Sequence, residues 1–256
     1  MVVIDKELCT GCGNCVADCI SAKLSVKDGK AVYSGECLYC GHCVAICPAG
    51  AVSIPEYDME DVEDGQFDII QVRDLLTVVK SRRSIRRYQD KRIEREKLEN
   101  IVQVGRYTAT GANRQACRFI LVQDELEKLK VLIWDRVEKA VHSGVQEAAP
   151  LKMLVDMRAD KGIDYLFRNA PAVLYIAAES PWDAGMASQN MELAAVSQGL
   201  GFLYNGFLLR STELCDEAKM LLKVEGKPLE ACMLLGYPDV VYQRTSPRKK
   251  ADAVWL

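Results

Sequence analysis

The chain has 256 residues, and its 33 basic and 36 acidic residues give a formal net charge of −3. This length suits one large domain, or a medium domain with a small attached one, and the charge balance gives no indication of a nucleic-acid partner. No apolar run approaches the about 18 residues of a membrane span, and the first residues lack a signal-peptide pattern, so we expect a cytoplasmic protein without a membrane partner.

Cysteine spacing distinguishes the first segment from the rest of the chain. Eight of the 11 cysteines form two runs with identical internal spacing, Cys9, Cys12, Cys15 and Cys19, then Cys37, Cys40, Cys43 and Cys47. A short apolar stretch follows each run, at residues 24–26 and 51–54, and we expect these two stretches to pair as strands. Because so little apolar material cannot form a stable core, metal must supply the stability of this segment.

The spacing of each run is the C-x2-C-x2-C-x3-C pattern of bacterial two-cluster ferredoxins. In that pattern three cysteines of one run and the fourth of the other hold each [4Fe-4S] cluster. This predicts one cluster on Cys9, Cys12, Cys15 and Cys47, and a second on Cys37, Cys40, Cys43 and Cys19. Pro48 follows the last cysteine as the pattern requires, whereas Ile20 replaces the other proline. Zinc sites and disulfides are the alternatives, and His42 is expected to be a cluster neighbour rather than a ligand.

An acidic segment follows the second run. It contains seven carboxylates beside Gly65, namely Glu56, Asp58, Glu60, Asp61, Glu63, Asp64 and Asp68. This composition is typical of a solvated linker, and the alternative is a docking patch for a basic electron donor. We therefore expect a cluster-binding domain at residues 1–57, an acidic linker at 58–71 and a second domain at 72–256.

The second domain is expected to combine long helices with a few strands. Apolar residues at helical spacing predict helices over 72–79 and 94–107, before any strand. Further along, the pattern predicts strands at 119–123, 172–178 and 231–235, and helices at 126–141, at 186–200 and from Thr212 onward. This order indicates an α+β domain.

Four segments of the second domain carry chemical information. Residues 82–88, RRSIRRY, offer guanidinium groups and a hydroxyl that suit a phosphate, although a basic run alone is more often a solvated face. Residues 109–115 form a small-residue loop with Asn and Gln, and residues 199–207 a glycine-bearing turn after the long helix. That turn is not a dinucleotide fingerprint, because it follows a helix and its third glycine is misplaced. Residues 235–238 form the end of the last expected strand. A basic tail follows at residues 244–250.

In this order the segments resemble the FMN-dependent nitroreductases, in the subgroup with an N-terminal two-cluster ferredoxin domain. The resemblance covers the cysteine runs and residues 72–256. It implies a domain with helices around a mainly antiparallel central sheet, and a homodimer with FMN at its interface. Ala116 and Cys117 depart from the family's frequent proline and tryptophan, which leaves the pocket's shape and substrate open.

The resemblance also implies roles for particular residues. Arg82, Arg83 and Ser84 would hold the FMN phosphate and nearby polar groups. Thr110, Gly111, Asn113 and Gln115 would reach the flavin of the other subunit. Tyr204, Asn205 and Gly206 would lie at the flavin ring, and Arg248 and Lys249 would close over the phosphate.

Clusters that move single electrons, joined to a flavin, predict an oxidoreductase. We expect ferredoxin or NAD(P)H as the donor and a nitroaromatic, quinone or activated alkene as the acceptor. No side-chain acid or base stands out as catalytic. The alternative is an electron-transfer relay or redox sensor whose acceptor is another protein, and an open pocket at the flavin would favour the enzyme over the relay.

Overall fold

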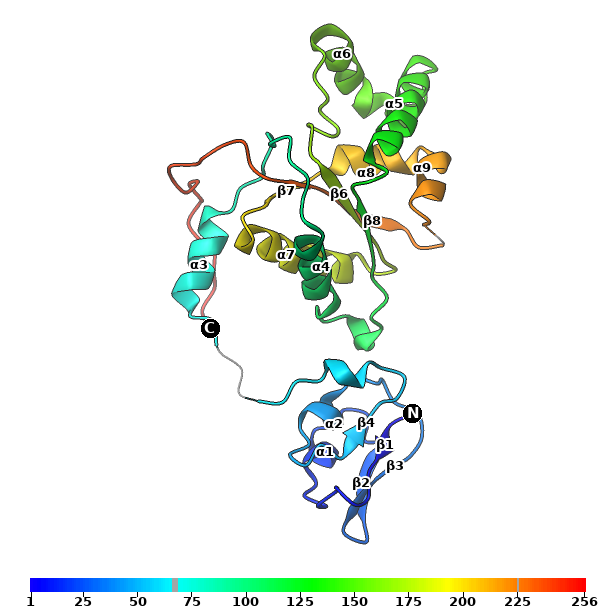
Figure 1. The fold of residues 1–256 in the computed structure, drawn as a ribbon, viewed down its shortest axis with the longest axis vertical. Coiled ribbons are helices and arrows are strands. Elements are labelled where there is room, and N and C mark those ends of the chain that lie inside the picture. The colour runs from blue at the N-terminus through cyan, green and yellow to red at the C-terminus, as the bar shows by residue number, and fades with distance from the viewer. Residues whose placement is uncertain (66–68, 225) are drawn as a thin grey trace. The chain divides into compact units, whose positions relative to one another are not determined.

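The structure is a computed structural model that describes residues 1–65, 69–224 and 226–256 (Figure 1). The chain divides into two compact units. The first contains Met1–Ile69 and Thr110–Arg114, and the second contains Ile70–Ala109 and Gln115–Leu256. Asp68 of the acidic segment lies outside the described residues. The domain boundaries at 57/58 and 71/72 stay a prediction.

The first unit contains two pairs of short antiparallel strands and two one-turn helices. Its strands are β1 (Val3–Ile4), β2 (Leu24–Lys27), β3 (Lys30–Tyr33) and β4 (Val52–Ser53), its α-helices are α1 (Asn14–Ala17) and α2 (His42–Ala45), and its 3-10 helices are η1 (Met59–Asp61) and η2 (Gly111–Asn113). β1 pairs with β4, and β2 pairs with β3. The expected pairing of residues 24–26 with 51–54 was therefore wrong. The turn at Asp28–Gly29 lets β2 pair with its sequence neighbour, which closes a much shorter loop.

Little apolar material is buried in the first unit. Its apolar contacts form two small groups, one around Leu24, Ala31 and Ala51, and one around Val2 and Ile54. Cys9 and Cys15 are themselves among the buried side chains. A core of this size agrees with the expectation that metal ligation stabilises the segment.

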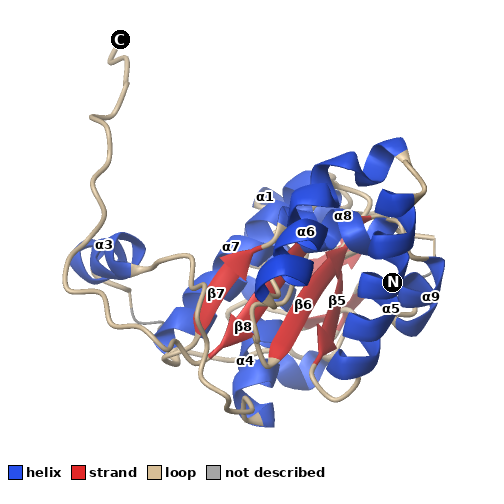
Figure 2. Ribbon diagram, turned by 90° about the horizontal axis from the view of Figure 1, so that it is seen from above, coloured by secondary structure: helices blue, strands red, loops and turns tan. Residues whose placement is uncertain are grey.

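The second unit is built on one antiparallel sheet with helices on both faces (Figure 2). Strand order is β5-β6-β8-β7, and the strands are β5 (Arg118–Val122), β6 (Ala172–Ala177), β7 (Gly201–Tyr204) and β8 (Leu229–Gly236). The helices are α3 (Val72–Ser81), α4 (Arg95–Arg106), α5 (Leu126–His142), η3 (Gln146–Leu151), α6 (Lys152–Lys161), α7 (Pro181–Ser197), α8 (Gly206–Glu213) and α9 (Asp216–Leu221). The α+β fold with a mainly antiparallel central sheet is confirmed.

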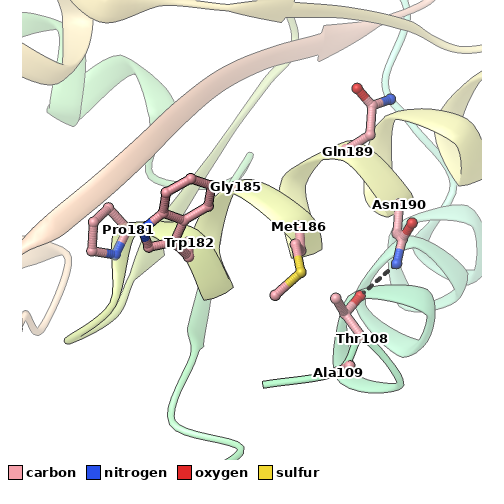
Figure 3. Close-up of a pocket in the computed structure, with 8 residues that line it drawn as sticks. All are labelled: Thr108, Ala109, Pro181, Trp182, Gly185, Met186, Gln189 and Asn190. Atoms are coloured by element: carbon pink, nitrogen blue, oxygen red, sulfur yellow. Dashed lines mark hydrogen bonds between the residues drawn. The ribbon is translucent and has the colours of Figure 1, made fainter. Parts of the chain in front are cut away.

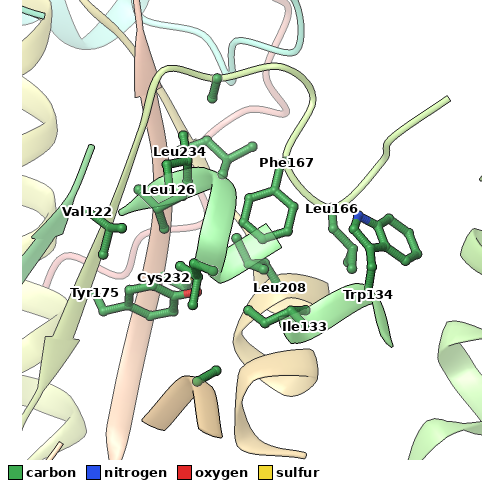
Figure 4. Close-up of a cluster of buried hydrophobic side chains, with 14 of the residues drawn as sticks. Val122, Leu126, Ile133, Trp134, Leu166, Phe167, Tyr175, Leu208, Cys232 and Leu234 are labelled. Atoms are coloured by element: carbon green, nitrogen blue, oxygen red, sulfur yellow. The ribbon is translucent and has the colours of Figure 1, made fainter. Parts of the chain in front are cut away.

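Alternation along β6 builds the two hydrophobic layers. Val173 and Tyr175 point into the layer formed with α5, α8 and α9, whereas Leu174 and Ile176 point into the layer formed with α4 and α7. Figure 4 shows the first layer around Tyr175. The Tyr175 hydroxyl lies 2.9 Å from Thr212 Oγ1, so its polar end is satisfied inside the core.

Two helix boundaries differ from the sequence expectation. α7 begins at Pro181 rather than near 186, because Ser180 Oγ accepts the Asp183 N–H at 3.2 Å and proline suits the first helical position. The helix expected to begin at Thr212 was wrong, since Thr212 lies near the end of α8 and donates its hydroxyl to Leu208 O at 2.8 Å. The segment expected as a glycine-bearing turn contains strand β7.

Candidate functional site

Two hollows in the first unit are each lined by four of the predicted cysteine ligands. Cys9, Cys12, Cys15 and Cys47 line the first hollow. Cys37, Cys40, Cys43 and Cys19 line the second. Each hollow takes three cysteines from one run and the fourth from the other, as the ferredoxin pattern requires. Among the described residues, no three His, Cys, Asp or Glu side chains meet closely enough to hold a single metal ion. The ligand assignment itself stays a prediction.

Backbone amides donate to four of these sulfurs. The bonds are Ala31 N to Cys9 Sγ at 3.3 Å, Tyr39 N to Cys37 Sγ at 3.2 Å, Lys23 N to Cys19 Sγ at 3.4 Å and Ala51 N to Cys47 Sγ at 3.3 Å. Lys23 and Ala51 occupy the same position after the last cysteine of each run. N–H donors directed at thiolates stabilise the negative charge of an iron-sulfur cluster, so the donor set of both hollows fits such a group.

The cysteines differ in their electrostatic surroundings. The N–H groups of Ala31 and Gly11, followed by the nearby charge of Lys30, lower the pKa of the Cys9 thiol. Burial instead raises the pKa of Cys15 and of Cys43. Lowering the pKa of a thiol favours the thiolate, which is the form that ligates iron.

His42 lies in the wall of the second hollow, as a neighbour of the cysteines. Its Nδ1 is 3.1 Å from Asp18 Oδ2, and both side chains are exposed. The pair joins the two cysteine runs, because Asp18 precedes Cys19 and His42 precedes Cys43.

In the second unit, the basic motif runs beside β7 at the edge of the sheet. Ser84 pairs in parallel with Phe202, and the Ile85 N–H donates to Phe202 O at 3.0 Å. A Cβ added at Gly201 would lie 2.5 Å from Ile85 Cγ1, so this close approach requires a glycine. The arrangement holds Ser84 and Ile85 against β7, directly after Arg82 and Arg83.

Arg82 is held by a carboxylate that the sequence analysis did not single out. Its Nε donates to Glu192 Oε1 at 2.7 Å, and Glu192, on α7, is only 1% exposed. Glu192 Oε2 accepts from Gln189 Nε2 at 3.2 Å, so both carboxylate oxygens are engaged. An acidic residue between the apolar Met191 and Leu193 of α7 was the signal that could have identified it, because buried charges require a partner.

Arg83 carries a buried donor that is not satisfied within the described part of the chain. Its Nη1 donates to Lys80 O and Arg82 O, at 2.9 Å and 2.6 Å. Its Nη2 is buried and has no hydrogen-bond partner there. A buried unpaired donor is destabilising, and a phosphate oxygen would satisfy it with a charge-assisted bond. The basic motif therefore fits an FMN phosphate.

Tyr204, Asn205 and Gly206 follow directly from β7 into α8. Burial raises the pKa of the Tyr204 hydroxyl, and the charges of Glu192 and Arg82 act on it in opposite directions. The Asn205 side chain is used by the fold: Oδ1 accepts the Leu208 N–H at 2.9 Å, and Nδ2 donates to Leu166 O at 2.6 Å. Gly206 is the first residue of α8, where an added Cβ would meet no atom within 4 Å. Their contact with flavin stays a prediction.

The small-residue loop has an unusual backbone. Ala112, Asn113 and Gln115 all have left-handed φ angles of 49–52°. Asn113 Nδ2 donates to Tyr39 O at 2.8 Å, within the first unit, and Thr110 and Gly111 belong to that unit as well. Contact with the flavin of a partner subunit stays a prediction for all four residues, Thr110, Gly111, Asn113 and Gln115.

The basic tail follows β8 without regular secondary structure and is exposed. Arg248 Nη1 donates to Ser246 Oγ at 2.7 Å. No hydrogen bond or ion pair described for the chain joins Arg248 or Lys249 to Arg82, Arg83 or Ser84. Closure of the tail over a phosphate stays a prediction.

An open pocket of about 650 Å³ lies where the end of α4 meets the N-terminal half of α7 (Figure 3). Its lining residues are Thr108, Ala109, Pro181, Trp182, Gly185, Met186, Gln189 and Asn190. Asn190 Nδ2 donates to Thr108 Oγ1 at 2.9 Å and so joins the two helices. Gln189 both lines the pocket and bonds Glu192, which connects the pocket wall to Arg82 through α7.

Cys117 lies near this region but is poorly suited to act as a nucleophile. Burial, with Asp183 adding to the effect, raises the pKa of its thiol. Cys215 and Cys232 are buried, and burial raises the pKa of each of their thiols as well. All three therefore remain thiols at neutral pH.

Comparison with known proteins supports both units. The nitroreductase family model matches residues 79–237, and a 4Fe-4S dicluster domain model matches residues 1–48. An FMN reductase (NADPH) of Bacillus subtilis strain 168 is 32% identical over 137 residues, which cover 51% of this chain and 53% of the relative. The chain thus spans little more than half the length of the curated relatives it matches.

Solved structures share the fold of the second unit. A nitroreductase with bound FMN from Bacteroides fragilis NCTC 9343 has 21% identity and a TM-score of 0.59, covering 72% of this chain and 99% of its own. An FMN-dependent nitroreductase from Clostridium difficile R20291 has 22% identity and a TM-score of 0.57, covering 72% of this chain and all of its own. Within the described ranges, no helix has the length and apolar character needed to cross a bilayer.

Proposed function

Because the chain belongs to the nitroreductase family and carries a 4Fe-4S dicluster domain, we propose that it is an FMN-dependent oxidoreductase fed through two [4Fe-4S] clusters. Its acceptor is a small conjugated molecule, such as a nitroaromatic, a quinone or an activated alkene. One observation carries the proposal: two four-cysteine hollows share a chain with a basic motif whose Arg83 has a buried, unsatisfied donor.

The two cofactor types supply complementary chemistry, since clusters transfer single electrons and a flavin exchanges electrons singly or in pairs. The chain's own residues bind and orient them. Arg83 Nη2 and Ser84 are available to phosphate, while Glu192 fixes the direction of the Arg82 guanidinium. No side chain is assigned as a catalytic acid or base.

The pocket between α4 and α7 supports reduction of a small acceptor. At about 650 Å³ it has the size of a ligand site, and apolar side chains such as Trp182 and Met186 lie beside polar Gln189. An open pocket at the flavin would favour an enzyme over a relay, and we propose that this pocket is that site. Exposed carboxylates, including Glu60 and Glu63, favour the alternative of a relay or sensor that docks a basic protein.

The proposal includes a homodimer. α3 exposes an apolar face formed by Val72, Leu75, Leu76 and Val79, which are 44–78% exposed within this chain. Such a face requires a partner surface in water, and a second copy would provide one. A cytoplasmic location and a ferredoxin or NAD(P)H donor also remain parts of this proposal.

The decisive experiment is anaerobic purification with iron, sulfide and flavin quantified per chain, for the native protein and for Arg83→Ala. We expect about eight irons per chain from two four-iron clusters, and about one FMN per chain, in the native protein. Arg83→Ala should lose most of its FMN, because the buried phosphate donor is removed, and should keep its iron, because the cysteine hollows are unchanged. Arg87→Ala, which alters an exposed arginine of the same motif, should retain both.

Anaerobic mixing then separates the donors and acceptors. Rapid bleaching of the flavin by NADPH would identify a pyridine-nucleotide donor, and bleaching only by reduced ferredoxin would identify the protein donor. Reoxidation by nitro or quinone compounds is expected. A reduced flavin that none of these compounds reoxidises would rule out the enzyme and leave the relay.

A further inference from the structure

The two cysteine hollows differ in what contacts them. A Cβ added at Gly11 would lie 2.0 Å from Gly29 O, so the turn of the β2–β3 hairpin presses against the first cysteine run. Tyr39 occupies the equivalent position in the second run. The duplicated pattern is therefore symmetric in its ligands but not in its surroundings.

The hairpin brings an additional hydrogen-bond donor to the first hollow. Tyr39 N donates a hydrogen bond to Cys37 Sγ, and at the equivalent position Gly11 N donates to the sulfur of Cys9. Cys9 Sγ also accepts the N–H of Ala31, at 3.3 Å, from the hairpin. For Cys37, no second amide donor is described in the structure, although the hydroxyl of Tyr33, also on the hairpin, interacts with its sulfur.

The hairpin also holds positive charge beside the first hollow. Lys30 Nζ donates to Cys9 O at 2.6 Å, and Lys6 Nζ donates to Ala31 O. Carboxylates also lie in these segments, namely Asp5, which accepts the N–H groups of Glu7 and Leu8, and the exposed Glu7 and Asp28. The two ammonium groups bond directly to Cys9 and Ala31, the two residues that the Ala31 N–H to Cys9 Sγ bond joins.

Different charged groups lie beside the second hollow. Lys23 lines it, and Asp18, next to Cys19, brings a carboxylate that contacts His42. Lys23 supplies an ammonium group to this hollow, while Asp18 and the exposed imidazole of His42 form a pair beside it. Glu36 precedes Cys37 and is exposed.

We propose that the β2–β3 hairpin raises the reduction potential of the cluster on Cys9, Cys12, Cys15 and Cys47 above that of its twin, with Lys30 as the main charge. This inference rests on the proposed function, because it needs two [4Fe-4S] clusters. Reduction adds one electron to a cluster, from the 2+ to the 1+ state, so positive charge and N–H donors near the sulfurs stabilise the reduced form. Of the two clusters, the first is therefore reduced before its twin.

Potentiometric titration of the full chain with dithionite, followed by low-temperature EPR of the reduced clusters, tests this ordering. The native protein should show two separate one-electron cluster waves. Lys30→Gln should lower the reduction potential of the higher wave only. The expected shift is about 59 mV for one electron, which corresponds to a tenfold change in the equilibrium constant. Lys30→Arg keeps the positive charge, so its higher wave should have the same potential as in the native protein.

Two control variants make the assignment specific. Lys27 pairs with Lys30 across the hairpin, so Lys27→Gln removes the same charge from the same element and should leave both waves in place. Lys23→Gln should lower only the other wave, because Lys23 lines the second hollow. If Lys30→Gln loses iron, Lys6→Gln supplies the same comparison through the second ammonium group.

The possible failures are distinguishable. Fewer than two clusters in the native protein, by iron content and EPR, would contradict the proposed function itself. Two clusters with coincident waves, equal shifts of both waves in Lys30→Gln, or an equal shift in Lys27→Gln would overturn the inference about the hairpin.

Discussion

Within the second unit, Glu192 connects the basic motif to the wall of the pocket between α4 and α7. It lies on the core helix α7, and it holds Arg82 of the basic motif with one oxygen and Gln189 of the pocket wall with the other. Because Arg82 Nε is occupied, the remaining guanidinium nitrogens point in a fixed direction. A carboxylate at this position therefore orients the arginine that the sequence predicts for phosphate binding.

We predict that Glu192→Gln weakens FMN binding roughly tenfold. The change keeps the size of the side chain but removes the charge, and a hydrogen bond to a charged group stabilises by about 1.5–3 kcal/mol. A loss of 1.4 kcal/mol corresponds to a factor of ten in affinity. Titration of the flavin-free protein with FMN, followed by fluorescence, measures the dissociation constant.

Glu99→Gln is the matched control for this prediction. Glu99 also accepts from an arginine Nε, that of Arg95 at 2.7 Å, but both side chains are exposed. Exposed pairs of this kind contribute little, so FMN affinity should not change. Equal affinity in Glu192→Gln and the native protein would show that the buried pair serves packing alone.

Sequence reasoning reached the cysteines and the basic motif but not their neighbours. Cys9 and Cys47 could be assigned to one hollow because the duplicated cysteine pattern specifies that the fourth cysteine of each run serves the other cluster. Glu192 could not be assigned to Arg82, since the two residues are 110 positions apart and only the packing of α7 against the sheet edge brings them together. The same reason hid the contact of Lys30 with Cys9.

At the scale of elements, the junction between the basic motif and β7 depends on one glycine. Gly201 opens β7, and its lack of a side chain lets Ile85 lie against the strand. This contact sets the position of residues 82–88, because Ser84 pairs with the next residue of β7, Phe202.

We predict that Gly201→Ala destabilises the second unit by about 1–3 kcal/mol, the usual effect of overpacking a core. Its Cβ would lie 2.5 Å from Ile85 Cγ1, so the basic motif must shift and FMN retention should fall as well. Denaturant unfolding monitored by circular dichroism gives the stability, and absorbance of the purified protein gives the flavin content.

Gly185→Ala provides the opposite case within the same unit. Gly185 lies inside α7, and an added Cβ there meets no atom within 4 Å. Alanine is favoured over glycine in a helix by about 1 kcal/mol, so this variant should be slightly more stable than the native protein. Similar stability losses in both variants would contradict the steric explanation.

Element boundaries were predictable where the chain's own pattern decides them. α3, α5 and β6 matched closely because apolar periodicity specifies them without reference to partners. The start of α7 was missed because its cap, Ser180, precedes the apolar run. β7 was missed because Gly201 serves a contact with a distant segment rather than a turn.

For the whole molecule, the exposed apolar face of α3 predicts that two copies of the chain form a dimer. Leu76→Glu should convert a dimer to a monomer, because it places a charge in the middle of that face, and should reduce bound FMN if the flavin site uses both subunits. Sedimentation velocity measures the mass, and absorbance measures the flavin.

Thr77→Glu is the control for the helix. It adds the same charge to the neighbouring position of α3, whose hydroxyl bonds only its own helix, at Arg73 O. It should remain dimeric. Monomers in the native protein, at concentrations where FMN is fully bound, would contradict the proposed assembly.

The first unit is discontinuous in sequence, since residues 110–114 belong to it together with residues 1–69. A ribosome releases domains in order from the N-terminus, and most domains can fold once their own segment has emerged. Here the segment with the cysteines emerges first and still lacks part of its unit. Synthesis must therefore pass residue 114, well beyond the cysteine runs, before every residue of the first unit has emerged.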